Sequence, residues 1–226
     1  MGPVPSDPEQ ITDYMANLLG PDPHIRIRQA SFDHRETHGE DCDVHPSNPL
    51  SMRLLYALVR GCQAERVLEI GCGLGYSAAW LAEAVGPRGK VETIERDPLH
   101  AELAGEMLKE AGLDDRIHIL RGEANEVVEA LNGRYRLIYD DAWFMAEPKY
   151  LERVVDLLRP GGLLVMANWF PLADAIAGGG DTDWAQSFGA DWAELIQAYA
   201  SNLASHRRLR MAFSLDPWLG LAVKTD

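Results

Sequence analysis

Residues 66–77 read Arg66-Val67-Leu68-Glu69-Ile70-Gly71-Cys72-Gly73-Leu74-Gly75-Tyr76-Ser77, and this stretch decides the fold. It begins as a short apolar run with β-branched residues, which is typical of a buried strand in a parallel sheet. Glycine then occupies every second position from 71 to 75, and apolar residues at helical spacing follow. Open α/β sheets build nucleotide sites from a strand, a glycine turn and a helix, because glycine lets backbone N–H groups approach a ligand closely.

The spacing of the glycines separates two classes of nucleotide ligand. A dinucleotide-binding turn needs G-x-G-x-x-G, and Tyr76 stands where the last glycine should be. Glu69, two residues before the first glycine, would repel a pyrophosphate but suits the ammonium and sulfonium groups of S-adenosylmethionine. A second short strand ends in Glu95, about 20 residues after the turn, where a ribose-binding acid is expected. The alternatives are an ordinary βα turn and a solvated strand-end carboxylate, but the two acids together favour S-adenosylmethionine.

Composition indicates a single domain with an acidic surface. The 226 residues are enough for one sizeable core, and the hydrophobic content of 46% argues against global disorder. The net charge of −14 disfavours nucleic acid and membrane partners, because phosphate backbones and anionic lipid heads would be repelled. No leader-like segment and no apolar stretch near 18 residues is present, so we expect a cytoplasmic protein.

The three cysteines, Cys42, Cys62 and Cys72, predict neither a disulfide framework nor a zinc site. Their number is odd, and they contain no C-x-x-C pair.

The chain before the glycine strand contains a histidine-rich segment. A helix is expected over residues 6–20, ending at Gly20-Pro21. Residues 33–46 then hold three of the seven histidines among five carboxylates. One interpretation is a substrate-covering loop that carries a general base or helps to bind a metal, and the other is a solvated acidic loop. We single out His45 because it directly precedes the next expected helix, residues 48–59.

The remaining chain alternates strands and helices. In an open sheet a ligand lies beyond the carboxyl ends of the strands, so the turn at residues 121–125 should flank an adenine. Two closing strands joined only by Asp216-Pro217 should pair antiparallel. The expected strands are 91–95, 117–120, 137–139, 163–167, 208–215 and 218–223, and the expected helices are 97–112, 148–158 and 190–205.

Five sequence blocks in a fixed order carry a family resemblance. They are VLEIGCGLGYSAAWLA, VETIERDP, AGLDDRIHILRGEA, DDAW and LLRPGGLLVMAN. With them the chain, over residues 43–172 and the closing strands, resembles the class I S-adenosylmethionine-dependent O-methyltransferases, especially the catechol and caffeoyl-coenzyme A group. The resemblance implies a Rossmann-like α/β fold of about seven strands, the last antiparallel, with helices on both faces. We divide the chain into an N-terminal helix and substrate-covering segment, residues 1–45, and a methyltransferase domain, residues 46–226.

The resemblance also implies a set of cofactor-binding residues. Glu69 and the glycine turn hold the methionine portion, with help from Ser77. Glu95 takes the ribose hydroxyls, and Asp141 sits between the methionine end and a metal. Arg96 and residues 122–124 enclose the adenine. The full set is Glu69, Gly71, Gly73, Gly75, Tyr76, Ser77, Glu95, Arg96, Gly122, Glu123, Ala124 and Asp141.

The family's magnesium site is incomplete in this sequence. Family members take oxygen ligands from an Asp after the fourth strand and an adjacent Asp-Asn pair after the fifth. Asp141 and Asn168 match, but Ala167 replaces the second Asp. Phe144 stands where the family has the lysine usually assigned as the base. Because magnesium needs carboxylates to offset its dehydration, we expect weak magnesium binding or none. Asp140 is an alternative ligand, although Asp141 takes the inward position of an alternating strand.

These departures shape the expected mechanism. A phenol titrates near pH 10, so an enzyme working at neutral pH supplies a cation or a base to expose its oxyanion. We expect a metal-independent enzyme with His45 as the first candidate for the base and Asp141 as the other catalytic residue. An acceptor that needs little deprotonation is the alternative. Four aromatic residues either form an acceptor pocket or are ordinary core side chains: Trp143, Phe144, Trp169 and Phe170.

Three functional classes follow from the sequence. The favoured class is O-methylation of a small phenolic or otherwise hydroxylated acceptor by a homodimer. The second is RNA modification by the same fold, which the acidic surface disfavours. The third is a catalytically degenerate protein that binds S-adenosylmethionine, since two catalytic positions have changed.

Overall fold

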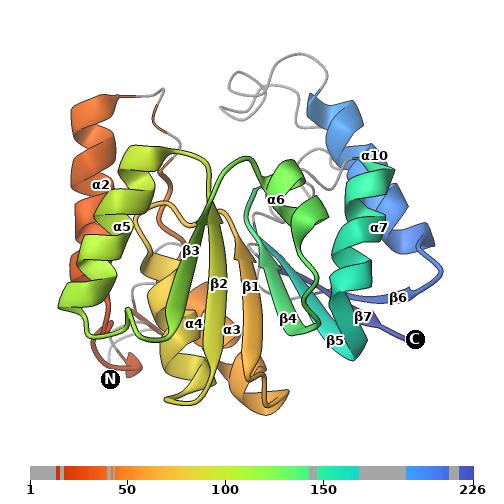
Figure 1. Cartoon of the computed structure of the whole chain (residues 1–226), viewed down its shortest axis with the longest axis horizontal. Helices are drawn as coiled ribbons and strands as arrows, with labels where there is room; N and C mark the ends of the chain where they lie inside the picture. Colours follow the sequence, from red (N-terminus) through yellow and green to blue (C-terminus); the bar gives the residue numbers. More distant parts are fainter. Residues whose placement is uncertain are drawn as a thin grey trace.

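The computed structural model describes residues 14–15, 18–39, 42, 44–142, 147–167, 192–213 and 219–226. Its elements alternate along the chain as the sequence predicted (Figure 1). The strands are β1 (Arg66–Ile70), β2 (Lys90–Glu95), β3 (Ile117–Arg121), β4 (Tyr135–Asp140), β5 (Leu158–Ala167), β6 (Leu209–Phe213) and β7 (Leu219–Lys224). The helices are α2 (Ile25–His38), α3 (Pro49–Gly61), α4 (Tyr76–Val85), α5 (Pro98–Glu110), α6 (Ala124–Ala130), α7 (Pro148–Leu157) and α10 (Trp192–Ser205).

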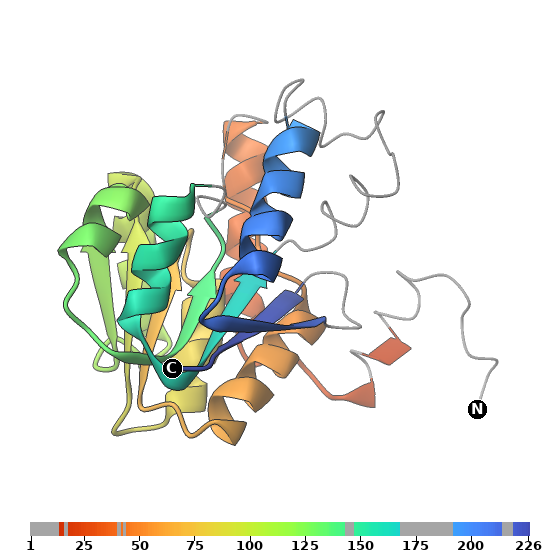
Figure 2. The same cartoon turned by 90° about the vertical axis from the view of Figure 1, so that its right-hand side faces the viewer.

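The strands form one seven-stranded sheet in the order β3-β2-β1-β4-β5-β7-β6. The first five strands are parallel, whereas β7 runs antiparallel to both β5 and β6. Figure 2 shows β6 and β7 at the open edge of the sheet, beside α10. The fold class predicted from the sequence is therefore confirmed. Because β2 and β4 flank β1 on opposite sides, the chain order reverses at β1, and ligands of open sheets bind at the carboxyl end of such a switch point.

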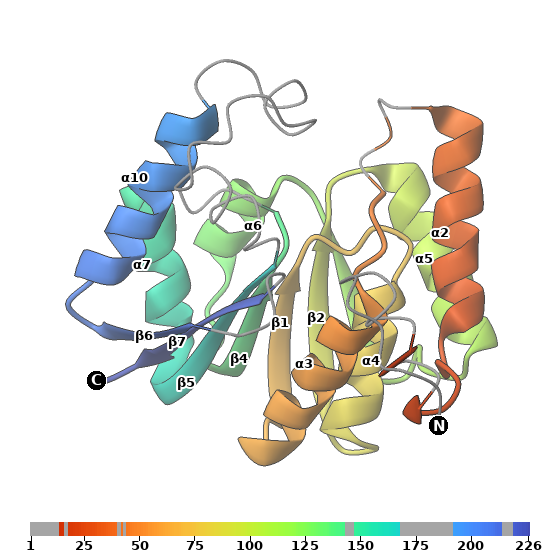
Figure 3. The same ribbon diagram turned by 180° about the vertical axis from the view of Figure 1, so that it is seen from behind.

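Two hydrophobic cores lie on the two faces of the sheet. Side chains alternate along β1, so Val67 joins one core while Leu68 and Ile70 join the other. Helices α3, α4 and α5 cover the face with Val67, and Figure 3 shows α3 and α4 lying across it. Helices α6, α7 and α10 cover the opposite face. The glycine turn therefore follows directly after a strand, β1, that is buried on both faces of the sheet.

Two helices begin with caps that the sequence encodes. At α3 the Asn48 side chain accepts a hydrogen bond from the Leu50 N–H at 2.8 Å, with proline at the first helical position. At α5 the Asp97 side chain accepts from the N–H groups of Leu99 and His100. The second cap fixes the start of α5 at the carboxyl edge of the sheet, directly after Glu95.

The structure differs from the predicted secondary structure in three places. Residues 33–38, expected in a loop, belong to helix α2, which buries only Ile27 and Ser31 and so lacks the apolar stripe that reveals a helix in a sequence. Strand β5 begins at Leu158 rather than 163, and the β4–β5 ladder shifts register between Tyr135 and Leu137. Helix α6 follows the turn after β3 and was not predicted.

The expected helix over residues 6–20 lies mostly outside the described residues. In the described part of the chain, no helix combines the length and apolar character needed to cross a membrane.

Candidate functional site

A cavity of about 870 Å³ opens at the carboxyl ends of β1, β2 and β4. It brings together nearly all of the residues that the sequence selected. Its lining includes Gly71, Gly73, Tyr76, Ser77, Glu95, Arg96, Gly122, Glu123, Ala124, Asp141 and His45. Among the predicted residues, Glu69 and Gly75 do not line it.

The glycine turn needs glycine for two separate reasons. Gly71, Gly73 and Gly75 all have positive φ, at +94°, +53° and +90°. A Cβ added to Gly71 would lie 3.1 Å from the backbone oxygen of Asp141, and one added to Gly75 would lie 3.1 Å from the Leu108 side chain. Both the left-handed backbone and the close packing therefore exclude side chains here, and the turn can approach a ligand directly.

Glu95 ties the glycine turn to the start of α5. Its carboxylate accepts hydrogen bonds from the Gly73 N–H at 2.7 Å and from the Asp97 N–H at 2.9 Å. Only 7% of Glu95 is exposed, and that part faces the cavity. The arrangement presents an oriented carboxylate at the place where the sequence predicted a ribose-binding acid.

Glu69 lies inside the protein rather than in the cavity wall. It is fully buried and accepts a hydrogen bond from the Thr93 hydroxyl at 2.5 Å. Burial raises the pKa of Glu69 to about 7, against the opposing effect of hydrogen bonds from Ser77 and Thr93. Glu69 therefore bonds within the protein interior, and its part in cofactor binding stays a prediction.

The two acids at the end of β4 differ in their surroundings. Asp141 is half-buried and lines the cavity, and its N–H donates to the Ile70 carbonyl at 2.8 Å. Asp140 is 3% exposed, and its Oδ1 accepts from the Ala142 N–H at 2.9 Å. Oδ2 of Asp140 has no hydrogen-bond partner among the described residues, and burial raises the pKa of this carboxyl to about 7. Asp141 therefore lines the cavity, whereas Asp140 is not among the lining residues and could not replace a metal ligand there.

The described residues do not fit a magnesium ion at the family's position. Asp141 supplies one carboxylate there, and Ala167 has no side-chain oxygen. Asn168 lies outside the described residues, as do the four aromatic residues proposed for the acceptor pocket, Trp143, Phe144, Trp169 and Phe170. A cation that prefers octahedral oxygen ligation finds too few oxygen ligands in the described part.

His45 lines the cavity and contacts Arg35. The Arg35 guanidinium lies 2.9 Å from His45 Nδ1, and a guanidinium can only donate. Nδ1 therefore accepts, which places the ring proton of the neutral imidazole on Nε2. If His45 acts as a base, Nδ1 is the nitrogen that receives the proton of the substrate. Arg35 must then release Nδ1 before the proton can be transferred.

Sequence reasoning did not single out four other polar side chains of the cavity. They are His34 and His38 on α2, Cys42 just after it, and His100 on α5. A usable signal existed for His100, because it lies in the first helical turn after a strand that ends in a binding acid. His34, His38 and Cys42 belong to the histidine-rich segment at residues 33–46, for which metal binding was one interpretation, but only His45 was singled out from it.

Comparisons with known proteins agree with this geometry. A family model described as O-methyltransferase matches residues 40–213. The chain is 33% identical over 179 residues to the catechol O-methyltransferase of Mycobacterium tuberculosis (strain ATCC 25618 / H37Rv), covering 79% of this chain and 76% of that one. It is 32% identical over 164 residues to the catechol O-methyltransferase of Niastella koreensis, covering 71% of this chain and 72% of that one.

A solved structure shows the same fold with a cofactor. The O-methyltransferase TomG from Streptomyces achromogenes, involved in tomaymycin synthesis and solved in complex with SAM, is 28% identical to this chain. The two superpose with a TM-score of 0.74 over 96% of each chain. The resemblance indicated by the sequence blocks is thus confirmed, and the chain belongs to the O-methyltransferase family.

Proposed function

We propose that this O-methyltransferase transfers the methyl group of S-adenosylmethionine to a phenolic or other hydroxyl of a small acceptor, without magnesium. The observation that carries the proposal is the cavity in which the glycine turn meets the Glu95 carboxylate. The catechol O-methyltransferases among its relatives support a small hydroxylated acceptor.

The cofactor is S-adenosylmethionine, as the sequence predicted. When bound, it supplies an electrophilic methyl group on a sulfonium. Glu95 would accept hydrogen bonds from the ribose hydroxyls, and Arg96 with residues 122–124 would enclose the adenine. The turn at Gly71 and Gly73, with Ser77 and Asp141, would hold the methionine portion beside the reacting centre. These residues align the donor, and alignment alone contributes up to about 7–11 kcal/mol in favourable cases.

The acceptor hydroxyl must lose its proton during the transfer. The two residues predicted to be catalytic, Asp141 and His45, both line the cavity, and each has a side chain that can take this proton. We keep His45 as the first candidate, on condition that Arg35 releases Nδ1 when the acceptor binds. A base at this position contributes about 10²–10⁴-fold, so His45→Gln should lower kcat by that factor while S-adenosylmethionine affinity changes little. Equal kcat in the variant would assign the step to Asp141 or to an acceptor that needs little deprotonation.

Magnesium independence is tested by turnover with a catechol acceptor in metal-free buffer, with and without added Mg²⁺. We expect the rate of S-adenosylhomocysteine release to stay within about twofold, because the described residues at the family's metal position supply one carboxylate, against the several oxygen ligands such a cation needs. A strict requirement for Mg²⁺ would overturn this part of the proposal and leave the methyl transfer itself intact.

A catalytically degenerate binding protein is the second candidate, and Ala167 is the observation that favours it. Such a protein would bind S-adenosylmethionine but release no S-adenosylhomocysteine over a panel of phenolic acceptors. RNA methylation is disfavoured by the net charge of −14, and retention of the protein on tRNA at moderate salt would argue for it.

We also propose a homodimer that uses the N-terminal segment. Large apolar side chains there are exposed in the single chain, including Leu18 at 64%, Leu19 at 50% and Ile25 at 48%. These three side chains lie within residues 18–25, and we take them as the candidate interface, because large exposed apolar patches mark such sites. Sedimentation equilibrium should give twice the chain mass, and Leu18→Glu with Leu19→Glu should give the monomer. A wild-type monomer at micromolar concentration would contradict the proposal.

A further inference from the structure

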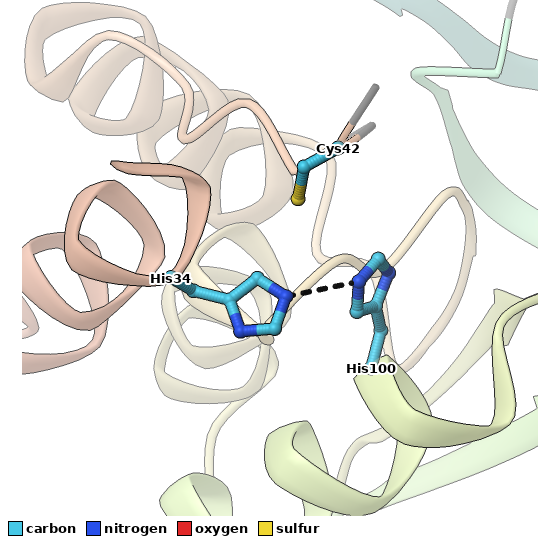
Figure 4. Close-up of side chains that lie close together, drawn as sticks. All are labelled: His34, Cys42 and His100. Atoms are coloured by element: carbon cyan, nitrogen blue, oxygen red, sulfur yellow. Dashed lines mark hydrogen bonds between the residues drawn. The ribbon is translucent and has the colours of Figure 1, made fainter. Parts of the chain in front are cut away.

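We propose that His34, Cys42 and His100 bind a Zn²⁺ ion at the rim of the donor cavity. One ligand atom from each side chain lies within 4.8 Å of the other two. Figure 4 shows the three side chains pointing toward one another, with the two imidazoles joined by a hydrogen bond. They come from three places in the sequence: helix α2, the segment after it, and the first turn of α5.

The spacing of the two imidazoles already matches a zinc site. His34 Nε2 and His100 Nε2 are 3.2 Å apart. A tetrahedral zinc ion with Zn–N bonds of about 2.0–2.1 Å holds two such nitrogens about 3.3–3.4 Å apart. The Cys42 side chain is 7% exposed and approaches the same point, so its thiolate needs only a small movement to complete a three-ligand set.

The surroundings hold the imidazoles in the ligating orientation. His100 presents Nδ1 toward Glu95 Oε1 at 4.0 Å, and this leaves Nε2 facing the cluster. This separation is longer than a hydrogen bond, but it places a carboxylate on the side where metal-ligating histidines commonly donate their other ring N–H. On the other side, the His38 ring stacks on His34 with centroids 4.2 Å apart. Both imidazoles are therefore oriented before any ion arrives.

The ligand types select zinc rather than magnesium. Thiolate and imidazole are soft and borderline ligands, whereas magnesium takes oxygen ligands and retains several waters. All three residues also line the cavity, so the fourth position faces open space and can be taken by water or a bound molecule. The ligands lie on α2, the segment after it and α5, and none comes from the ends of β4 and β5, where the family's metal residues stand.

A bound ion would join α2 to α5 across one side of the donor cavity. These helices lie side by side in Figures 1 and 3, and the His34–His100 hydrogen bond connects them. Zinc would replace this hydrogen bond with coordinate bonds, beside the Arg26–Glu110 ion pair at 3.6 Å that also joins the two helices, and would fix the segment that contains Cys42, Val44 and His45. We expect zinc to raise the thermal unfolding midpoint and to tighten S-adenosylhomocysteine binding. The second effect rests on the proposed function, whereas zinc binding itself does not.

The test uses the full chain without a histidine tag, stripped of metal by dialysis against chelator. Titration with Co²⁺ should give one equivalent bound and a thiolate-to-cobalt charge-transfer band, and Zn²⁺ should displace the cobalt. Cys42→Ser should abolish that band. Loss of a residue that only supports a metal ligand weakens metal binding by about 10–100-fold. His34→Ala and His100→Ala each remove a ligand itself, so each should weaken Zn²⁺ binding by at least that factor.

Two matched variants control for general damage. Cys62→Ser removes a cysteine whose thiol donates only to the Val59 carbonyl, and His118→Ala removes an exposed histidine on β3. Both should bind Zn²⁺ and Co²⁺ as the wild type does. Absence of stoichiometric zinc in the wild type, a cobalt complex without the thiolate band, or equal losses in the controls would overturn the proposal. Cys42→Ser should have the same thermal unfolding midpoint as the wild type in metal-free buffer. Weaker metal binding by this variant then reflects the missing thiolate ligand rather than damage to the fold. S-adenosylhomocysteine binding without zinc would leave the proposed function standing while the zinc site fails.

Discussion

Gly71 is the residue at which backbone geometry and the cavity meet. Its φ of +94° and the 3.1 Å approach of a would-be Cβ to the Asp141 oxygen both oppose a side chain. Gly71→Ala should therefore destabilise the fold by about 1–3 kcal/mol and displace Asp141 from the cavity wall. Chemical denaturation and S-adenosylhomocysteine titration measure the two effects.

Gly61 provides the matched control for this prediction. It ends α3, and a Cβ there would meet nothing within 4 Å. Gly61→Ala should be neutral or slightly stabilising, because it reduces the freedom of the unfolded chain. Equal losses of stability and of S-adenosylhomocysteine affinity in the two variants would show that the geometry of the glycine turn does not cause the effect of Gly71→Ala.

Glu95 should dominate recognition of the ribose. Its carboxylate is oriented by two backbone N–H groups, so its free lone pairs face the cavity at no further ordering cost. Glu95→Ala should weaken S-adenosylhomocysteine binding by about 10–100-fold, the value of hydrogen bonds to a charged group. Glu102→Ala, an exposed change on α5, should leave affinity as it is. Calorimetric affinity unchanged in Glu95→Ala would remove this residue from the site.

Asp140 should make stability depend on pH. Burial raises its pKa from 3.8 to about 7, so the folded state holds its proton more tightly than the unfolded state. The contribution to stability is fully present below about pH 4, falls as pH rises to about 7, and is then constant. Asp140→Asn keeps an acceptor for the Ala142 N–H but cannot ionise.

The free energy of unfolding of Asp140→Asn, relative to the wild type, should therefore rise between pH 4 and pH 7, by up to about 4 kcal/mol. Glu69 titrates in the same range in both proteins and cancels in the difference. Denaturant unfolding at several pH values measures the difference. A difference independent of pH would show that folding does not raise the pKa of Asp140.

For single residues, the sequence predicted the features that depend on neighbours along the chain. It missed those that depend on contacts between residues far apart in the sequence. The glycine spacing and Glu95 are local signals, and Gly71, Gly73 and Glu95 all line the cavity. Glu69 is fully buried and hydrogen-bonded by Thr93 and Ser77, and no local pattern in the sequence reveals this burial. The cluster of His34, Cys42 and His100 joins residues far apart in the chain, so a search for short cysteine motifs could not find it.

Among the elements, β7 is held in place by a buried lysine. Lys224 is 5% exposed, and its Nζ donates to the carbonyls of Val155 and Leu158 at 2.8 Å each. These carbonyls lie at the junction of α7 and β5, so one side chain ties the last strand to that junction. Lys224→Met keeps the apolar stem but leaves both carbonyls without this donor.

Lys224→Met should lower the free energy of unfolding by about 2–4 kcal/mol, since two buried hydrogen bonds from a charged group are lost. Lys109→Met, at an exposed position near the end of α5, should stay within about 0.5 kcal/mol. Denaturant unfolding of the two variants measures the difference. Similar free energies of unfolding for the two variants would show that Lys224 does not hold β7 in place.

Strands were easier to predict than the outlying helices. The parallel strands are short apolar runs bounded by turn residues, and the antiparallel closing pair followed from its short link. Helix α2 buries two residues and gains its position from α4 and α5, where His24 pairs with Glu83 at 3.0 Å and His34 with His100. Tertiary contacts of this kind leave no periodic signal in the sequence.

For the whole molecule, the topology determines where the chemistry can occur. The reversal of chain order at β1 places the glycine turn, Glu95 and Asp141 at one edge of the sheet, and helix α2 closes one side of the cavity. The fold and the donor site were therefore predictable together, because one strand–turn–helix unit specifies both. The acceptor was not predictable, because its pocket depends on how several separate segments assemble.

The central claim is that this cavity binds the methyl donor, and calorimetric titration of the purified chain with S-adenosylhomocysteine tests it most directly. The account predicts saturable binding of one molecule per chain, competitive with S-adenosylmethionine. Absence of any binding heat or competition at millimolar ligand would contradict it.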